Sequence, residues 1–504
     1  MKTSRILAAL CLVAPLAALA SAGDDPSLRL PRSTPEEQGV SSAALLGFVQ
    51  AAEERIDAPH SFMLVRHGRV VAEGWWAPYA ADEPHELYSL SKSFTSTAVG
   101  LAVSDGKLSV DDPVLKFFPD KAPAAPSKNL RSMRVRDLLR MCTGQREEDL
   151  KAFPFQSQLD LARVFLELPA PDKPGSHFVY NTAATYMLSA IVQKVTGQTV
   201  LDFLRPRLFE PLGISNPTWE ASAQGVSLGG FGLSVRTEDI ARFGQLYLQK
   251  GQWRGRQLVP AGWVEAATSL QTSNGSDPDS DWDQGYGYQF WRCRHGFYRG
   301  DGAFGQFCVV MPEYDAVIAI TSATKDLQAV LNVVWERVLP AFGEAPLPAD
   351  PASDRLLAER LAGLSLPTKA GQPTSPTAAR IAGRRFVFPA NRQGVESIMF
   401  EPAAEGADVV IAARVAGKDQ RIVCGRGSWV KGSIVMGERG PVPIAVSGAW
   451  SSEDTYSLIL YRYETPFSTT YDVRFAGDEA ILDVDTNVGL EPPGRIRLVG
   501  KAQP

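Results

Sequence analysis

Cysteine is scarce in this sequence, with five residues in a chain of 504. Disulfide-stapled scaffolds are much denser in cysteine, so the fold must rest on a hydrophobic core. The sequence leaves open whether Cys293 and Cys308 form a single disulfide. The four cysteines beyond the amino-terminal segment are spaced too widely to resemble a metal site: Cys142, Cys293, Cys308 and Cys424. The five histidines also lack the short-spaced pairs typical of zinc sites: His60, His67, His85, His177 and His295.

The chain also lacks an excess of either charge, since its formal net charge is −5. A dedicated nucleic-acid binder needs a basic surface to contact phosphates, so we expect no nucleic-acid partner. Hydrophobic residues make up 44% and charged residues 21%, which is typical of an ordinary globular protein. The length predicts two or three domains.

Long apolar runs are missing except for one short stretch at the amino terminus. Lys2 and Arg5 are followed by the apolar residues Ile6–Leu19 and by the small residues Ala20-Ser21-Ala22. This layout is typical of a secretory signal peptide, and the apolar run is too short to span a membrane comfortably. We therefore expect residues 1–22 to be cleaved after Ala22. The protein is then expected to be secreted or periplasmic, with no membrane span.

Prolines crowd one stretch of the chain, residues 344–376, around a short amphipathic segment at Asp354–Leu364. This pattern predicts a linker between a first domain, residues 23–343, and a second domain, residues 377–504. The prolines are Pro346, Pro348, Pro351, Pro367, Pro373 and Pro376.

Strand and helix patterns mix in the first domain. Ser61–Arg66 and Arg69–Trp76 predict a hairpin with His67-Gly68 near its turn, and Phe94–Val103 predicts a buried helix. In the second domain helical periodicity almost disappears and short β-rich runs recur, which favours an antiparallel barrel or sandwich. These runs are Val409–Val415, Ser428–Met436, Thr455–Tyr463 and Thr470–Phe475.

Two serine motifs compete as sources of a catalytic nucleophile. Gly225-Val226-Ser227-Leu228-Gly229 matches the G-x-S-x-G elbow of α/β-hydrolases, which needs a buried strand before it and a helix after it. Residues 219–224 do not form a core strand pattern, and Gly230-Phe231-Gly232 does not begin a helix. The motif is therefore interpreted as a glycine-rich loop.

The rival motif is Ser-x-x-Lys, of which Ser89 with Lys92 is the instance at the start of a buried helix. Residues three apart share a helix face, so Lys92 would lie one turn from Ser89. A lysine in an apolar site is discouraged from keeping its proton and can help to deprotonate the serine. A capping serine beside a solvated lysine is the structural alternative. The other instances lie in a turn, a loop and a strand-like run: Ser104 with Lys107, Ser322 with Lys325, and Ser428 with Lys431.

The surrounding sequence resembles the serine β-lactamase superfamily, in the branch of class C β-lactamases, penicillin-binding-protein-like D-peptidases and β-lactamase-like esterases. The resemblance spans roughly residues 30–343. It rests on segments that occur in the family's order: Tyr88–Ser96, Gly106–Pro113, Val135–Gly144, Pro174–Asn181 and Gly229–Ser234. It implies an α/β fold, an α+β sandwich in which helices flank an antiparallel sheet beside an all-helical region.

The resemblance also implies roles for individual residues. Ser89 becomes the acyl-forming nucleophile, Lys92 its activating partner, and Tyr180 a second proton-transfer group that needs a nearby cation because a phenol ordinarily titrates near pH 10. The backbone N–H groups of Ser89 and Ala303 would form the oxyanion hole. The chemistry would require neither a metal ion nor an organic cofactor.

This sequence departs from the family at two motifs. The family's Tyr-x-Asn appears here as Tyr180-Asn181-Thr182, so either Asn181 or Thr182 fills the polar position. The third motif, which usually carries a lysine or histidine on a strand beside the serine, falls at Gly300-Asp301-Gly302 without a cation. Arg299 is adjacent, but a one-residue slip that moved it into place would reverse its face. Gly300, Asp301 and Gly302 are nonetheless expected to contact substrate.

The favoured interpretation is an exported serine hydrolase, a carboxylesterase or β-lactamase-related amidase, that acts on small esters or amides through acyl-Ser89. A catalytically silent binding or sensor protein that keeps the fold is the alternative from a different class. A true β-lactamase and a D-aminopeptidase are further alternatives. The expected partner is a small ester, amide or peptide substrate, and the sequence does not address oligomeric state.

Overall fold

The computed structural model of the chain describes residues 28–146, 153–155, 157–401, 408–436, 440–490 and 494–503. The signal peptide predicted at residues 1–22 lies outside these ranges. Within them, no helix is both long enough and apolar enough to cross a membrane.

The amino-terminal domain is built on a six-stranded antiparallel sheet with the order β2-β1-β11-β10-β9-β8. The predicted hairpin is confirmed, and His67 and Gly68 at its turn both have positive φ. The strands are β1 Pro59–Arg66, β2 Arg69–Trp75, β8 Trp291–Arg292, β9 Tyr298–Gly302, β10 Gln306–Met311 and β11 Ala316–Ser322.

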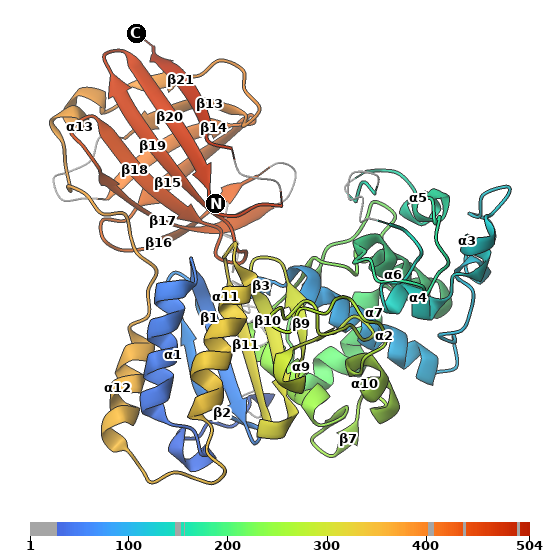
Figure 1. Cartoon of the computed structure of the whole chain (residues 1–504). Coiled ribbons are helices and arrows are strands. Elements are labelled where there is room, and N and C mark those ends of the chain that lie inside the picture. The colour runs from blue at the N-terminus through green and yellow to red at the C-terminus, as the bar shows by residue number, and fades with distance from the viewer. Residues whose placement is uncertain are drawn as a thin grey trace, which may run out of the picture.

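Both faces of this sheet are buried, and the alternation of side chains along β1 shows how. Phe62 and Leu64 point to one core, whereas Met63 and Val65 point to the other. The first core is covered by α1 Ser42–Arg55, α11 Leu327–Val333 and α12 Pro351–Ala362, and the second by α2 Ser91–Ser104 and α9 Thr237–Leu248 (Figure 1).

A helical region extends the second core away from the sheet and lies to the right in Figure 1. At its centre, α6 Thr182–Thr196 packs against α2, α4 and α5 and is buried along most of its length. The predicted fold, a sandwich with an all-helical region, is thereby confirmed. The helices around α6 are α3 Lys128–Ser132, α4 Val135–Leu139, α5 Leu161–Glu167, α7 Val200–Leu204, α8 Glu210–Leu212 and α10 Ala261–Thr268.

The proline-rich segment is held more firmly than its composition suggests. Its centre forms α12, which packs against α1 and β2, and Leu357, Leu364 and Leu366 are buried. The Ala77 N–H also donates to the Leu364 carbonyl, and the Leu366 N–H donates to the Ala77 carbonyl. The middle of the predicted linker is therefore packed on the amino-terminal domain, and the exposed stretch that leads into the second domain is residues 370–374.

The second domain is a ten-stranded antiparallel barrel that is nearly closed, as the sequence predicted in outline. Between the two end strands of the sheet, the Gln420 side chain donates to the Val435 carbonyl and accepts from the Val435 N–H. A side chain therefore makes the contacts that backbone hydrogen bonds make between the other strands. Helix α13 Pro376–Ile381 precedes the barrel. The strand order is β15-β14-β13-β12-β21-β20-β19-β18-β17-β16. The strands are β12 Arg385–Val387, β13 Val395–Phe400, β14 Val409–Val415, β15 Lys418–Cys424, β16 Val430–Val435, β17 Pro441–Trp450, β18 Thr455–Tyr461, β19 Ser468–Ala476, β20 Glu479–Thr486 and β21 Ile496–Ala502.

The disulfide considered between Cys293 and Cys308 does not form. Both thiols are free and buried, as are those of Cys142 and Cys424. Cys293 belongs to one core of the amino-terminal domain and Cys308 to the other, so the sheet separates them.

A buried histidine pair lies where the two domains meet. His60 Nδ1 is 3.1 Å from His85 Nε2, and His85 Nδ1 is 2.9 Å from the Glu86 carbonyl oxygen. The carbonyl can only accept, so His85 donates to it from Nδ1. Burial favours the neutral form of both rings, and in that form His60 Nδ1 donates to His85 Nε2. Burial lowers the pKa of His85 to about 4, and burial together with His85 lowers that of His60.

We expect this pair to make the folded protein less stable in mild acid. The pKa values are lower in the folded than in the unfolded chain, so the pair's contribution is complete above pH 6.5 and is lost as pH falls toward 4. For His85 alone the loss is about 3 kcal/mol of unfolding free energy by pH 4. Denaturant titrations at several pH values measure it, and His85→Gln should flatten the pH dependence. An unchanged slope in this variant would contradict the assignment.

Candidate active site

Ser89 lies in a single 3-10 turn, Tyr88–Leu90 (η3), that leads directly into helix α2. The preceding residue, Tyr88, has φ of 49°, a left-handed conformation that is uncommon for a bulky side chain. The bend before the helix presents the Ser89 side chain to a cavity instead of burying it within the helix. Ser89 is thus placed as the sequence predicted, at the start of a buried helix.

Lys92 lies one turn along from Ser89, and its side chain is only 1% exposed. Its Nζ is 3.0 Å from Ser89 Oγ, 3.2 Å from Thr182 Oγ1 and 2.9 Å from the Gly230 carbonyl oxygen. The carbonyl only accepts, whereas each hydroxyl either donates or accepts. A charged Nζ can therefore donate to all three oxygens. A neutral Nζ can instead accept from Ser89 Oγ and donate to Thr182 Oγ1 and the Gly230 carbonyl. This geometry lets a proton move between Ser89 and Lys92 without rearrangement.

Tyr180 lines the same cavity, on the other side of Lys92. The Lys92 Nζ lies over the Tyr180 ring, 4.8 Å from its centroid, so a cation stands close to this phenol. The ring stacks on Trp291, with centroids 5.4 Å apart and planes 23° apart. This stacking fixes the phenol at the edge of the site.

The polar position after Tyr180 is filled by Thr182 and not by Asn181. Thr182 is the first residue of α6 and accepts a hydrogen bond from Lys92. Asn181 is the N-cap of the same helix, where its side chain accepts from the Ala184 N–H (3.0 Å) and donates to Gln145. The departure from the family motif therefore exchanges an amide for a hydroxyl beside the lysine.

The third motif lies on β9, where two glycines allow the strand to approach the serine. A Cβ at Gly302 would lie 2.1 Å from the Leu87 carbonyl oxygen, and one at Gly300 would lie 2.1 Å from Leu90 Cδ1. These positions face η3 and α2, so they bring the strand against the nucleophile instead of presenting side chains to substrate. A lysine at position 300 would have to displace Leu90 first.

The adjacent charges of β9 are paired with each other. Arg299 is fully buried, donates from Nε to Asp301 Oδ2 (2.8 Å) and lies over the Trp282 ring at 4.5 Å. Burial raises the pKa of Asp301, and the Arg299 and Lys92 cations oppose that shift. Arg299 therefore does not replace the missing cation, because its charge is committed to Asp301.

Ala303 follows β9 and lines the cavity together with Ser89. It begins a tight turn, Ala303–Gly305, whose next residue, Phe304, has φ of 67°. The strand packs directly on η3, so the turn brings Ala303 beside the nucleophile, where its backbone N–H would serve an oxyanion.

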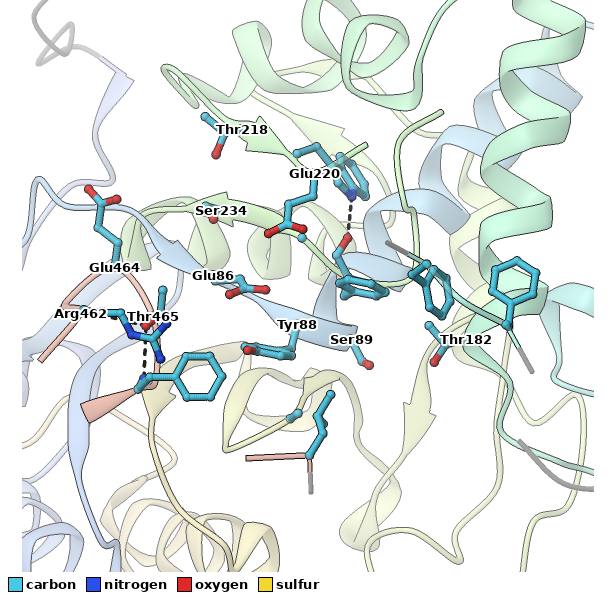
Figure 2. Close-up of a pocket in the computed structure, with 18 of the residues that line it drawn as sticks. Glu86, Tyr88, Ser89, Thr182, Thr218, Glu220, Ser234, Arg462, Glu464 and Thr465 are labelled. Atoms are coloured by element: carbon cyan, nitrogen blue, oxygen red, sulfur yellow. Dashed lines mark hydrogen bonds between the residues drawn. The ribbon is translucent and has the colours of Figure 1, made fainter. Parts of the chain in front are cut away.

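The cavity beside Ser89 is large, about 1210 Å³, and both domains line it (Figure 2). Its aromatic walls come from the amino-terminal domain and from Phe467 of the barrel domain. Among the residues that the structure describes, its charged lining consists of three carboxylates and one guanidinium: Glu86, Glu220, Glu464 and Arg462. The last two belong to the loop between β18 and β19. Glu86 lies on β3 His85–Glu86, which pairs with β5 Leu233–Val235 and through it with β4 Thr218–Trp219.

Ser227 is not at this site. Its side chain is buried, its carbonyl accepts from Ser189 Oγ (2.6 Å), and it does not line the cavity. The G-x-S-x-G match is therefore a structural loop, as predicted. In the described part of the chain no group of three or more histidine, cysteine or carboxylate side chains is arranged to hold a metal ion.

Comparison with known proteins identifies the family of this chain. The family model described as Beta-lactamase matches residues 48–340, which is more than half of the chain. The chain belongs to the β-lactamase family. Members of this family are serine hydrolases that cleave amides or esters.

Two curated relatives and one solved structure are similar to this chain. The chain is 27% identical over 320 residues to the 6-aminohexanoate-dimer hydrolase of Paenarthrobacter ureafaciens, a match that covers 58% of this chain and 80% of that one. It is 25% identical over 170 residues to the lovastatin esterase of Penicillium rubens, covering 29% and 42%. The solved octameric penicillin-binding protein homologue from Pyrococcus abyssi is 17% identical, with a TM-score of 0.47 over 90% of this chain and 99% of that one.

Sequence reasoning missed several residues of the β-lactamase-like site. The Gly230 carbonyl was included only as part of a loop, yet it accepts from Lys92. The acidic lining and the barrel loop were not foreseen, because Glu86, Glu220 and Arg462 are far apart in the chain and follow no spacing rule. A backbone carbonyl and residues from a second domain do not form a sequence motif, so they cannot be found from local patterns.

Proposed function

We propose that this protein is an exported serine hydrolase that cleaves small amides or esters through an acyl-Ser89 intermediate. The observation that carries the proposal is the 3.0 Å contact between Lys92 Nζ and Ser89 Oγ at the base of an open cavity. Activation of a serine requires a base within hydrogen-bonding distance, and this contact provides it. Export rests on the leader predicted at residues 1–22.

In the first step Ser89 Oγ attacks the substrate carbonyl carbon while its proton passes to Lys92. The carbonyl oxygen becomes an oxyanion, which the N–H groups of Ser89 and Ala303 stabilise. The tetrahedral intermediate then collapses, the bond to the leaving group breaks, and Tyr180 relays a proton to the departing amine or alcohol. Water attacks the acyl-Ser89 ester by the same route in reverse, which releases the acid and restores Ser89.

A fluorophosphonate probe tests this proposal against the alternative, a silent binding or sensor protein with the same fold. An active serine displaces fluoride from phosphorus and becomes covalently labelled. We expect stoichiometric labelling, with the tag mapped to Ser89 by peptide mass spectrometry. A protein that stays unlabelled and hydrolyses none of a panel of p-nitrophenyl esters, D-amino-acid amides and a chromogenic cephalosporin would favour the binding role.

The charges around the cavity favour neutral acyl groups over anionic ones. Arg299 is paired with Asp301, and among the described residues three carboxylates and one guanidinium line the cavity. We therefore expect kcat/KM for p-nitrophenyl butyrate to exceed that for p-nitrophenyl hemisuccinate, which has a similar length and a carboxylate, and cephalosporin hydrolysis to be weak or absent. Like charges about 4 Å apart in water repel by about 1 kcal/mol, or roughly fivefold in rate.

Glu220→Gln is the matched variant for this preference, since it removes one charge and keeps the side chain's size. The ratio of butyrate to hemisuccinate kcat/KM should fall in this variant, and added salt should narrow the ratio in the wild type. Lys431→Met, which changes a charge outside the cavity, is the control. A wild-type preference for the hemisuccinate or the cephalosporin would mean that Arg462 dominates the cavity's field.

A further inference from the structure

The loop between β18 and β19, residues 462–467, contributes most of the barrel residues that line the cavity, and Val442 and Leu490 contribute the others described. The loop is closed on itself, since the Arg462 N–H donates to the Phe467 carbonyl (3.0 Å) and the Thr465 N–H donates to the Arg462 carbonyl (2.8 Å). It is also tied to the amino-terminal domain, because Tyr79 Oη donates to the Thr465 carbonyl (3.0 Å) and the Glu86 N–H donates to the Glu464 carbonyl (2.8 Å). The loop is therefore held in a defined place beside the nucleophile.

Phe467, at the end of this loop, contacts two rings of the amino-terminal domain. Its centroid is 6.2 Å from that of Tyr88 and 5.8 Å from that of Phe304, both at steep angles. Tyr88 and Phe304 also meet edge to face, with centroids 5.1 Å apart. The three rings form one cluster at the wall of the cavity, where Phe467 and Tyr88 are both exposed to its interior.

The two rings that Phe467 contacts belong to residues adjacent to the oxyanion donors. Tyr88 precedes Ser89, and Phe304 follows Ala303. Both have a left-handed backbone, with φ of 49° and 67°. Such a conformation costs about 1–2 kcal/mol at a non-glycine residue, so it persists only where surrounding contacts hold it.

The backbone angles of Tyr88 orient the peptide that carries the Ser89 N–H, and the turn at Phe304 places Ala303. We propose that Phe467 is a positioning residue, through which the barrel domain holds both oxyanion donors in place. This inference rests on the proposed acyl-serine function. It assigns the barrel a part in the chemical step in addition to its part in forming the cavity wall.

The test compares two ketones of the same chain length, of which only the fluorinated one binds as an oxyanion and therefore needs the oxyanion hole. Ser89 Oγ adds to the carbonyl carbon of 1,1,1-trifluoroheptan-2-one. The serine proton passes to Lys92 and the carbonyl electron pair moves to oxygen, so this inhibitor binds as an oxyanion. 2-Heptanone has the same chain and binds as the intact ketone. A misplaced donor weakens the first inhibitor and spares the second.

In the full-length protein, Phe467→Ala should lower kcat for p-nitrophenyl butyrate by about 10- to 100-fold, less than the complete loss of a donor. KM should change little, and Ki for the trifluoroketone should rise by a similar factor to the loss in kcat. Ki for 2-heptanone should change less than about threefold. Phe467→Tyr, which keeps the ring, should restore most of kcat.

Trp429→Ala is the matched control, because Trp429 is a barrel aromatic that binds the linker through the Leu366 carbonyl and does not line the cavity. It should leave kcat and both inhibition constants unchanged. If Phe467→Ala does not fold, as judged by its thermal unfolding midpoint, Phe467→Leu provides the same comparison. Unchanged kcat, or equal weakening of both ketones, would overturn the positioning role. A wild-type protein without fluorophosphonate labelling would instead overturn the proposed function.

Discussion

Replacement of Ser89 by alanine is expected to abolish fluorophosphonate labelling and to reduce ester hydrolysis by at least about 10⁴-fold, as loss of a nucleophile does in other serine hydrolases. The variant should fold normally, because it removes one hydroxyl that faces an open cavity. A continuous p-nitrophenyl butyrate assay measures the loss, and thermal unfolding verifies the fold.

Ser227→Ala is the control for this result, since Ser227 lies in the competing G-x-S-x-G motif but is buried away from the cavity. It should keep nearly all the activity of the wild type. If Ser227→Ala were inactive while Ser89→Ala kept its activity, the choice of nucleophile would be wrong.

Replacement of Lys92 by methionine should have the next largest effect. Methionine fills a similar volume but cannot exchange a proton with Ser89, so we expect kcat/KM to fall by about 10²- to 10⁴-fold. Rates of single-turnover labelling by the fluorophosphonate should fall with it, because both reactions need a deprotonated Ser89. Loss of the contact to the buried Gly230 carbonyl should also lower the unfolding free energy by about 1–3 kcal/mol.

Lys431→Met is the matched control, because Lys431 repeats the spacing three residues after Ser428 but lies on strand β16. Lys431 pairs with Glu83 of the amino-terminal domain and lies outside the cavity. Its loss should change neither labelling nor hydrolysis. A Lys92→Met variant that labels at the wild-type rate would place the base elsewhere, with Tyr180 as the first candidate.

Features that depend on neighbours in the chain could be predicted from the sequence. The hairpin β1–β2 follows from two short apolar runs on either side of a turn at His67-Gly68, and helix α2 follows from a continuous apolar pattern. Ser89 and Lys92 fall within one helical turn, so their contact required only local geometry. An antiparallel barrel or sandwich was predicted because short β-rich runs recur in this domain, although closure through Gln420 was not.

Features that depend on residues far apart in the chain were decided by the tertiary structure. The motif after Tyr180 left Asn181 and Thr182 as alternatives, and only the packing of α6 against α2 placed Thr182 on Lys92 and turned Asn181 to its capping role. The prolines of residues 344–376 predicted a linker, but they could not reveal that α12 within it packs against α1 and buries Leu357.

The sequence by itself singled out Ser89 and Lys92 as the candidate nucleophile and its basic partner and predicted the fold around them, because the two residues stand three apart and the segments around them resemble those of one family. The tertiary structure alone decided the surroundings of the reaction. It paired Arg299 with Asp301, gathered Glu86 and Glu220 at the cavity, and placed Phe467 of the barrel against Tyr88 and Phe304. Such contacts join elements that can be hundreds of residues apart. They form because removing apolar surface from water is favourable whatever the separation of the two surfaces in sequence.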